Sequence, residues 1–248
     1  MRNGARRLLS RGLRPIARRA CLALCLWPAG AIAQDIITSA RYADPTTRYA
    51  HGVLGDAIEY GTLTITLQNG TKRRFTLPES AVFEDTEPRL YDVTGNGIPE
   101  VIVVESAQHQ GARLVVYSAD GEIAATPYIG TRFRWLAPLG AADLDGDGAV
   151  ELAYVDRPHL AKTLRIWRYT SAGLAEVASF AGVTNHRIGE ADIAGGIRSC
   201  GAGPEMILAS ADWSEMVALR LENGEIAASP IGGDTSRAAF ARAMTCDR

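Results

Sequence analysis

Cysteine, histidine and aromatic residues are scarce in this chain of 248 residues. It contains four cysteines and four histidines, and 7% of its residues are aromatic. No two histidines stand at the H-x-x-x-H spacing of a helical metal site, and no serine occupies a G-x-S-x-G elbow. The sequence therefore lacks the local signatures of metallohydrolases and serine hydrolases.

Long apolar runs are also lacking, because the run over residues 21–33 is too short for a bilayer-spanning helix, which needs about 20 apolar residues. Seven arginines and no acidic residue precede this run, which ends in Ala31-Ile32-Ala33. These are the parts of a signal peptide. We expect residues 1–33 to be that peptide, the protein to be periplasmic or secreted, and the mature chain to have no membrane span. The paired arginines leave Sec and twin-arginine export open.

Positive charge becomes scarce once the predicted leader is set aside. Seven of the 26 basic residues lie in it, so 19 remain against 28 acidic residues, a net charge near −9. Nucleic acids and anionic membranes bind basic patches. We therefore expect neither as a partner, which leaves a small-molecule, glycan or protein ligand, and we expect a monomer.

Only two cysteines, Cys200 and Cys246, lie outside the predicted leader. In an oxidising compartment, an even number of cysteines without metal-type spacing favours a disulfide. The alternative is a pair of buried free thiols.

A repeat of about fifty residues runs through the rest of the chain. Glycine-containing turns between apolar alternating segments recur at Gly70, Gly121, Gly173 and Gly224, with spacings of 51, 52 and 51 residues. The Asn69-Gly70 pair is typical of a type I′ hairpin. An aspartate that closes a short apolar segment precedes each hairpin, and these aspartates are Asp44, Asp92, Asp143 and Asp192.

Each repeat reads as strand, acidic loop, strand, loop, strand, glycine turn, strand. Four antiparallel strands per unit predict an all-β fold, a small β-propeller of four blades in one domain over residues 34–248. The units span approximately 38–80, 87–130, 135–181 and 186–232, followed by a tail at 233–248 with a short helix from 236 to 244. A two-sheet sandwich is the structural alternative.

The segment D-L-D-G-D-G-A-V-E at 143–151 places carboxylates at its first, third, fifth and ninth positions. Calcium takes six to eight oxygen ligands, and alternate positions of a tight glycine-rich loop direct several carboxylates to one centre. This segment therefore predicts a calcium site. The alternative is an acidic turn without an ion.

The same segment, with its flanking strands and the repeat length, resembles the FG-GAP or VCBS repeats of calcium-loop β-propellers related to the integrin α-subunit head. The chain after the leader is similar to bacterial VCBS repeat-containing secreted proteins. This resemblance implies ions in loops between the first two strands of a blade. It implies a main site with ligands Asp143, Asp145, Asp147, Glu151 and the backbone of Ala149, and a weaker second site at Asp92, Asn96 and Glu100.

A second candidate site comes from loops that enter the innermost strands and would gather at the mouth of the propeller channel. We expect these loops to bind an anionic or carbohydrate ligand through Arg132, Arg134, Asn185, His186, Arg187 and His51. The alternative is that these side chains bind backbone groups between blades.

Three functions remain open after these observations. The first is a calcium-stabilised, non-catalytic binding module with an unknown ligand. The second is a periplasmic hydrolase or lyase with His186 as general base, and with Arg187 or Arg134 stabilising negative charge. The third is a scaffold in an envelope complex, since propellers serve many unrelated functions.

Overall fold

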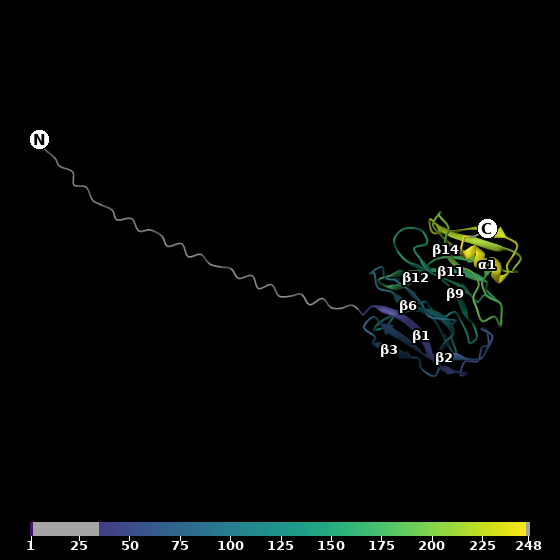
Figure 1. The fold of residues 1–248 in the computed structure, drawn as a ribbon, viewed down its shortest axis with the longest axis horizontal. Coiled ribbons are helices and arrows are strands. Elements are labelled where there is room, and N and C mark those ends of the chain that lie inside the picture. The colour runs from purple at the N-terminus through teal and green to yellow at the C-terminus, as the bar shows by residue number, and fades with distance from the viewer. Residues whose placement is uncertain (2–34, 247–248) are drawn as a thin grey trace. The chain divides into compact units, whose positions relative to one another are not determined.

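The computed structural model describes Met1 and residues 35–246. The predicted signal peptide, apart from Met1, lies outside the described residues. Residues 35–246 lie in one compact unit (Figure 1). Seventeen strands and one helix are described in it. The expected all-β class is confirmed. In this part of the chain, no helix is long and apolar enough to cross a membrane.

The first sheet combines the first two repeat units. Its order is β1-β2-β4-β6-β7-β8, with β3 paired to β2 and β5 paired to β6. The short strand β4 links the two units, because Phe83 pairs with both Tyr60 of β2 and Glu105 of β6. The strands are β1 (Ile37–Thr46), β2 (Glu59–Leu67), β3 (Lys72–Thr76), β4 (Ala81–Phe83), β5 (Arg89–Tyr91), β6 (Glu100–Ala107), β7 (Gly111–Ser118) and β8 (Gly121–Ala125).

The third and fourth repeat units each form a sheet of their own. The order is β12-β11-β10-β9 in one sheet and β13-β15-β16-β17 in the other, where β14 also pairs with β15. The third-unit strands are β9 (Leu136–Ala142), β10 (Glu151–Asp156), β11 (Thr163–Thr170) and β12 (Gly173–Ala181). Those of the fourth are β13 (Val183–Thr184), β14 (Gly196–Ser199), β15 (Pro204–Ser210), β16 (Met216–Glu222) and β17 (Glu225–Gly232).

All four glycine turns lie between paired strands, as the repeat predicted. Their turn types differ, however. Both central residues have positive φ in the Asn223-Gly224 turn (52° and 80°), as type I′ requires, whereas Asn69 has no positive φ. The Asn69 side chain instead accepts a hydrogen bond from the amide of Thr71. The type I′ prediction for Asn69-Gly70 is therefore wrong.

The first unit has three described strands, and the prediction of four is wrong there. Strand β1 pairs with β2 along most of its length, in the position that β6 takes beside β7. Asp44 therefore lies inside β1 rather than in an acidic loop. Its carboxylate accepts hydrogen bonds from Thr62 (2.6 Å) and Arg74 (2.7 Å).

Alternate residues of the central strands enter different cores, because successive strand side chains point to opposite faces. On β6, Val101 and Val103 pack with Leu63 and other residues of the first unit. Ile102 and Val104, on the other face, pack with the third unit through residues such as Leu152. The apolar faces of these sheets are therefore buried against the neighbouring repeat.

The helix α1 (Arg237–Met244) covers the outer face of the fourth sheet. Its buried Phe240 packs with Ile207 and Ala209 of β15. The side chain of Ser236 caps its first turn by accepting a hydrogen bond from Ala239. The short C-terminal helix expected from the sequence is thus observed.

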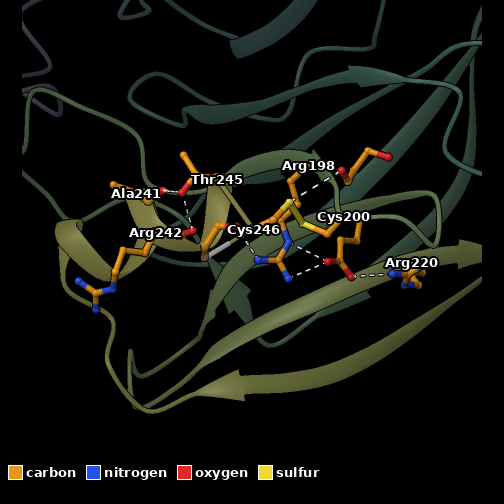
Figure 2. Close-up of a disulfide and its surroundings, with 10 residues drawn as sticks. Arg198, Cys200, Arg220, Ala241, Arg242, Thr245 and Cys246 are labelled. Carbon is orange, nitrogen blue, oxygen red and sulfur yellow. Dashed lines mark hydrogen bonds and ion pairs between the residues drawn. A yellow bond between two sulfur atoms is a disulfide. The ribbon is translucent and has the colours of Figure 1, made fainter. Parts of the chain in front are cut away.

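The predicted disulfide between Cys200 and Cys246 is present and fastens the residues after α1 to the loop between β14 and β15 (Figure 2). Beside it, Arg198 donates a hydrogen bond to the carbonyl oxygen of Ala243 in the last turn of α1 (2.6 Å). The cap on the fourth sheet is therefore held by apolar packing, a helix-end hydrogen bond and a covalent bond.

Candidate functional site

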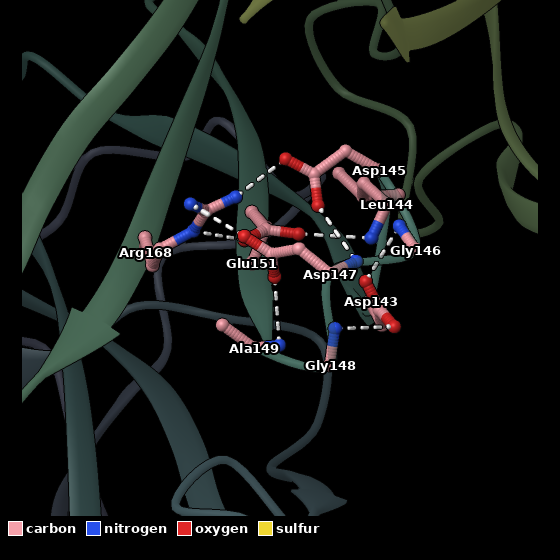
Figure 3. A network of polar contacts seen from close by, with 9 residues as sticks. All are labelled: Asp143, Leu144, Asp145, Gly146, Asp147, Gly148, Ala149, Glu151 and Arg168. Atoms are coloured by element: carbon pink, nitrogen blue, oxygen red, sulfur yellow. Dashed lines mark hydrogen bonds and ion pairs between the residues drawn. The ribbon is translucent and has the colours of Figure 1, made fainter. Parts of the chain in front are cut away.

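The loop at residues 143–151 connects β9 to β10, and its carboxylates accept hydrogen bonds from its own backbone amides (Figure 3). The two carboxylate oxygens of Asp143 accept hydrogen bonds from the amides of Gly146 (2.8 Å) and Gly148 (3.0 Å). Both glycines have positive φ, 79° and 89°, a conformation that side chains disfavour. At the end of the loop, Glu151 accepts a hydrogen bond from the amide of Leu144 (2.8 Å).

Three of the predicted metal ligands come together in this loop. One carboxylate oxygen from each of Asp143, Asp145 and Glu151 lies within 4.8 Å of the other two. Calcium binds oxygen at 2.3–2.6 Å, so two oxygens on one ion lie at most about 5 Å apart. This donor set fits a calcium ion. The carboxylate of Asp147 is not part of this group, and its Oδ1 accepts a hydrogen bond from the amide of Ala149.

The sequence analysis missed Arg168, whose guanidinium contacts three of these carboxylates. Its nitrogens lie 2.5 Å from Glu151, 2.6 Å from Asp145 and 2.9 Å from Asp147. The register of the two predicted strands could have identified it, because Arg168 of β11 pairs with Glu151 of β10. The hydrogen bond to Glu151 raises the pKa of Arg168, while burial raises the pKa of Glu151. The loop thus has a built-in counter-ion.

The loop at residues 92–100 has the same hydrogen-bonded form with fewer charges. Asp92 accepts hydrogen bonds from the amides of Asn96 and Gly97, and Glu100 accepts one from the amide of Val93. The Oδ1 of Asn96 accepts from the amide of Ile98. With two carboxylates instead of four, this loop offers a divalent ion less negative charge than the 143–151 loop.

A cavity of about 240 Å³ lies where four loops meet, and we call it the four-loop cavity. The contributing loops connect β1 to β2, β8 to β9, β10 to β11, and β13 to β14. Its lining residues are His51, Phe133, Arg134, Trp135, Arg157, Pro158, His159, Leu160 and Ile188.

Only two of the six predicted ligand-binding residues, His51 and Arg134, line this cavity. Arg132 lies over the rings of Tyr49 and Phe133, and Arg187 lies 3.7 Å from the centre of the Trp213 ring. The other two, Asn185 and His186, are buried. Sequence reasoning missed Phe133, Arg157, His159, Leu160 and Ile188 as cavity residues.

His51 is held by a buried carboxylate. Its Nδ1 lies 2.6 Å from Glu84, which is fully buried and also accepts a hydrogen bond from the hydroxyl of Ser106. Burial raises the pKa of Glu84, and the contact with His51 lowers it. In the tautomer whose Nδ1 donates to Glu84, Nε2 is the second ring nitrogen of His51.

A hydrogen-bonded chain fixes the other two histidines in this region. Nε2 of His186 donates to the carbonyl oxygen of Glu190 (2.8 Å), so its Nδ1 accepts from Nε2 of His159 (3.0 Å) when His186 is neutral. Burial lowers the pKa of both histidines, that of His159 to about 4. Both ring nitrogens of His186 are therefore engaged.

Comparison with known proteins identifies a repeat that contains both acidic loops. Residues 92–154 match the family model of FG-GAP-like repeats. The match begins at the first residue of the 92–100 loop, includes all of the 143–151 loop and ends within β10. No curated protein matches the chain.

Proposed function

We propose that this FG-GAP repeat-containing chain is an exported, calcium-stabilised β-propeller module that binds a ligand and does not catalyse a reaction. The observation that carries the proposal is the group of oxygens from Asp143, Asp145 and Glu151 within 4.8 Å of one another. A match to FG-GAP-like repeats over the same residues supports it independently. The disulfide between Cys200 and Cys246 supports an oxidising compartment.

In this proposal, the four repeat units are the blades of the module, with the first blade reduced to three strands. A backbone hydrogen bond from Gly189 to Val53 (3.0 Å) joins the loops of the last and first units beside the four-loop cavity. This contact supports a closed arrangement at the cavity end. The covering of the fourth sheet by α1 explains how its outer face stays buried.

Calcium would be held by Asp143, Asp145 and Glu151, with Asp147 and the backbone carbonyl of Ala149 completing the oxygen ligands. When bound, the ion supplies positive charge that offsets the repulsion among four carboxylates. The chain itself positions the carboxylates, since Glu151 begins β10 and loop amides orient Asp143. Calcium therefore ties the loop to the end of a buried strand.

The engagement of His186 argues for the binding module over the hydrolase or lyase. A general base needs a ring nitrogen within hydrogen-bond reach of the substrate proton. The two nitrogens of His186 contact His159 and Glu190, and the residue is 1% exposed.

Thermal unfolding of the purified, oxidised protein with EDTA and with calcium tests the proposal. At a free calcium concentration of ten times Kd, the ion should stabilise the fold by about 1.4 kcal/mol and raise Tm. Asp145→Ala should abolish this rise, whereas Asp120→Ala, in an exposed hairpin turn, should leave it intact. A calcium-independent Tm in a folded wild-type protein would refute the calcium proposal.

A further inference from the structure

The four-loop cavity is lined by two arginines and by exposed apolar side chains. Leu160 and Ile188 line it and are 63% and 73% exposed, the two highest values among the large hydrophobic residues of 35–246. Phe133 and Trp135 add aromatic surface. An apolar cavity with a few converging polar groups is the usual form of a small-molecule site.

Arg134 is the cation of this cavity that lacks an acidic partner. Its hydrogen bond within the described chain goes to the neighbouring carbonyl of Phe133, at the long distance of 3.5 Å. Arg157, by contrast, makes two hydrogen bonds to Asp156. The lining contains no acidic residue. Arg134 therefore offers a planar pair of donors to an anion that enters from solvent.

The backbone around the cavity is held in a strained form. Phe133 and Arg157 have positive φ values of 62° and 45°, which bulky side chains seldom adopt. The hydroxyl of the buried Tyr49 accepts a hydrogen bond from the amide of Phe133 (2.7 Å), and the Phe133 ring stacks on His51 with centres 4.8 Å apart. Such strain collects at functional sites, where it fixes side chains in place.

We propose that the four-loop cavity binds a small organic carboxylate with a flat apolar body. The carboxylate pairs with Arg134, and His51 lines the same cavity. The body packs between Phe133 and the Leu160 and Ile188 rim. This inference rests on the proposed binding function and gives it a ligand class.

Isothermal titration calorimetry with phenylacetate tests the ligand class, using acetate and phenylacetamide as probes that lack the body or the charge. We expect saturable binding of phenylacetate at millimolar concentrations or below, and at least about tenfold weaker binding of both controls. Equal affinity for phenylacetate and phenylacetamide would overturn the role of charge. A lack of saturable phenylacetate binding would overturn the proposal as a whole.

Two variants locate the bound probe. Arg134→Gln should weaken phenylacetate binding about tenfold or more, because it removes a charge-assisted hydrogen bond. Ile188→Ser should weaken it severalfold without affecting folding, since the side chain is 73% exposed. Arg73→Gln, at an exposed ion pair with Asp35, should change nothing. Equal losses in the Arg134 and Arg73 variants would place the probe elsewhere.

These titrations do not involve the acidic loop. A calcium-dependent Tm without phenylacetate binding would refute the ligand class and leave the calcium-stabilised module standing. Phenylacetate binding without a calcium-dependent Tm would refute the calcium stabilisation and leave the ligand class standing.

Discussion

Arg168 of β11 pairs across the sheet with Glu151, the last acidic residue of the 143–151 loop. In the fourth unit the same position holds Arg220, which lies 2.9 Å from Glu205, and Arg198 contacts the same carboxylate. In the second unit, the register of β6 and β7 places Ser118 there. Arginine therefore neutralises this buried glutamate in two of three repeats, and only the 143–151 loop also carries three aspartates.

Arg168→Ala should increase calcium affinity severalfold and lower Tm in EDTA. Without the guanidinium, four carboxylates repel one another until an ion binds, so calcium supplies more of the stability. Calorimetric titration and thermal unfolding measure the two effects. Arg220→Ala is the matched control, because it removes the corresponding arginine from a repeat with no acidic loop of this kind. An equal calcium increment in both variants would contradict this role of Arg168.

Glu59, the first residue of β2, is a second residue with an unusual environment. It is 2% exposed, and no ion pair to it is found within residues 35–246. Burial, with the nearby carboxylates of Glu84 and Asp56, raises its pKa to about 9. The folded protein therefore keeps Glu59 protonated at neutral pH, whereas the unfolded chain ionises it.

Stability should consequently fall as pH rises from about 4.5 to 9, because the folded state binds one more proton than the unfolded state in this range. Glu59→Gln should flatten this fall and raise the free energy of unfolding at pH 8 by at least about 1 kcal/mol. Urea unfolding at several pH values measures both. Glu225→Gln, at an exposed glutamate of β17, should keep the wild-type slope, and an unchanged slope in Glu59→Gln would refute the explanation.

At the scale of elements, the glycine turns and the terminal helix could be predicted because their signals are local. A turn glycine between alternating segments specifies a hairpin, and Ser236 before an alanine-rich segment specifies a helix start. The missing strand of the first unit could not be predicted this way. Taken alone, residues 37–46 look like the first, innermost strand of the unit. Only their pairing with β2 shows that they occupy the second strand position, which β6 has beside β7 in the next unit.

The disulfide and α1 together cover one face of the fourth sheet. Removing the disulfide should lower the stability of the protein. Cys200→Ser with Cys246→Ser should lower the free energy of unfolding by about 2–4 kcal/mol, since the bond spans 46 residues. Chemical denaturation of both proteins under oxidising conditions measures the loss. The wild-type protein treated with a reductant should match the double variant, and a difference below about 0.5 kcal/mol would mean that packing alone holds the cap.

At the scale of the whole molecule, the first and last units meet through their loops beside the cavity. A Cβ atom on Gly55 would lie 2.9 Å from the carbonyl oxygen of Gly189, whose amide bonds to Val53. Gly55→Ala should therefore disturb this contact, lower stability by about 1–3 kcal/mol and weaken phenylacetate binding.

Gly70→Ala is the matched control for that experiment. Gly70 also has positive φ (82°), but a Cβ atom there would meet nothing within 4 Å. Its cost should be confined to about 1 kcal/mol of backbone strain, with no change in ligand binding. Equal effects of the two alanines on stability and binding would show that the loop contact contributes nothing beyond local strain.

The repeat length and the turn register made a four-unit β fold predictable from the sequence, but the cavity lining was only partly predictable. Leu160 and Ile188 carry no motif, and they matter because loops from different units bring them together. Likewise, Arg187 was expected beside Arg134, but its guanidinium lies on Trp213 instead. Long-range packing decides these positions, and no local pattern records it.

The bond between Cys200 and Cys246 encloses β15, β16, β17 and α1 in one covalent loop. A protease that cuts a single peptide bond inside this loop, for example in the turn at residues 211–215, would leave both fragments attached to each other. The nicked chain would migrate as one species until a thiol separated it into two. For the exported protein proposed here, a single cut in this quarter of the fold would therefore not release a fragment.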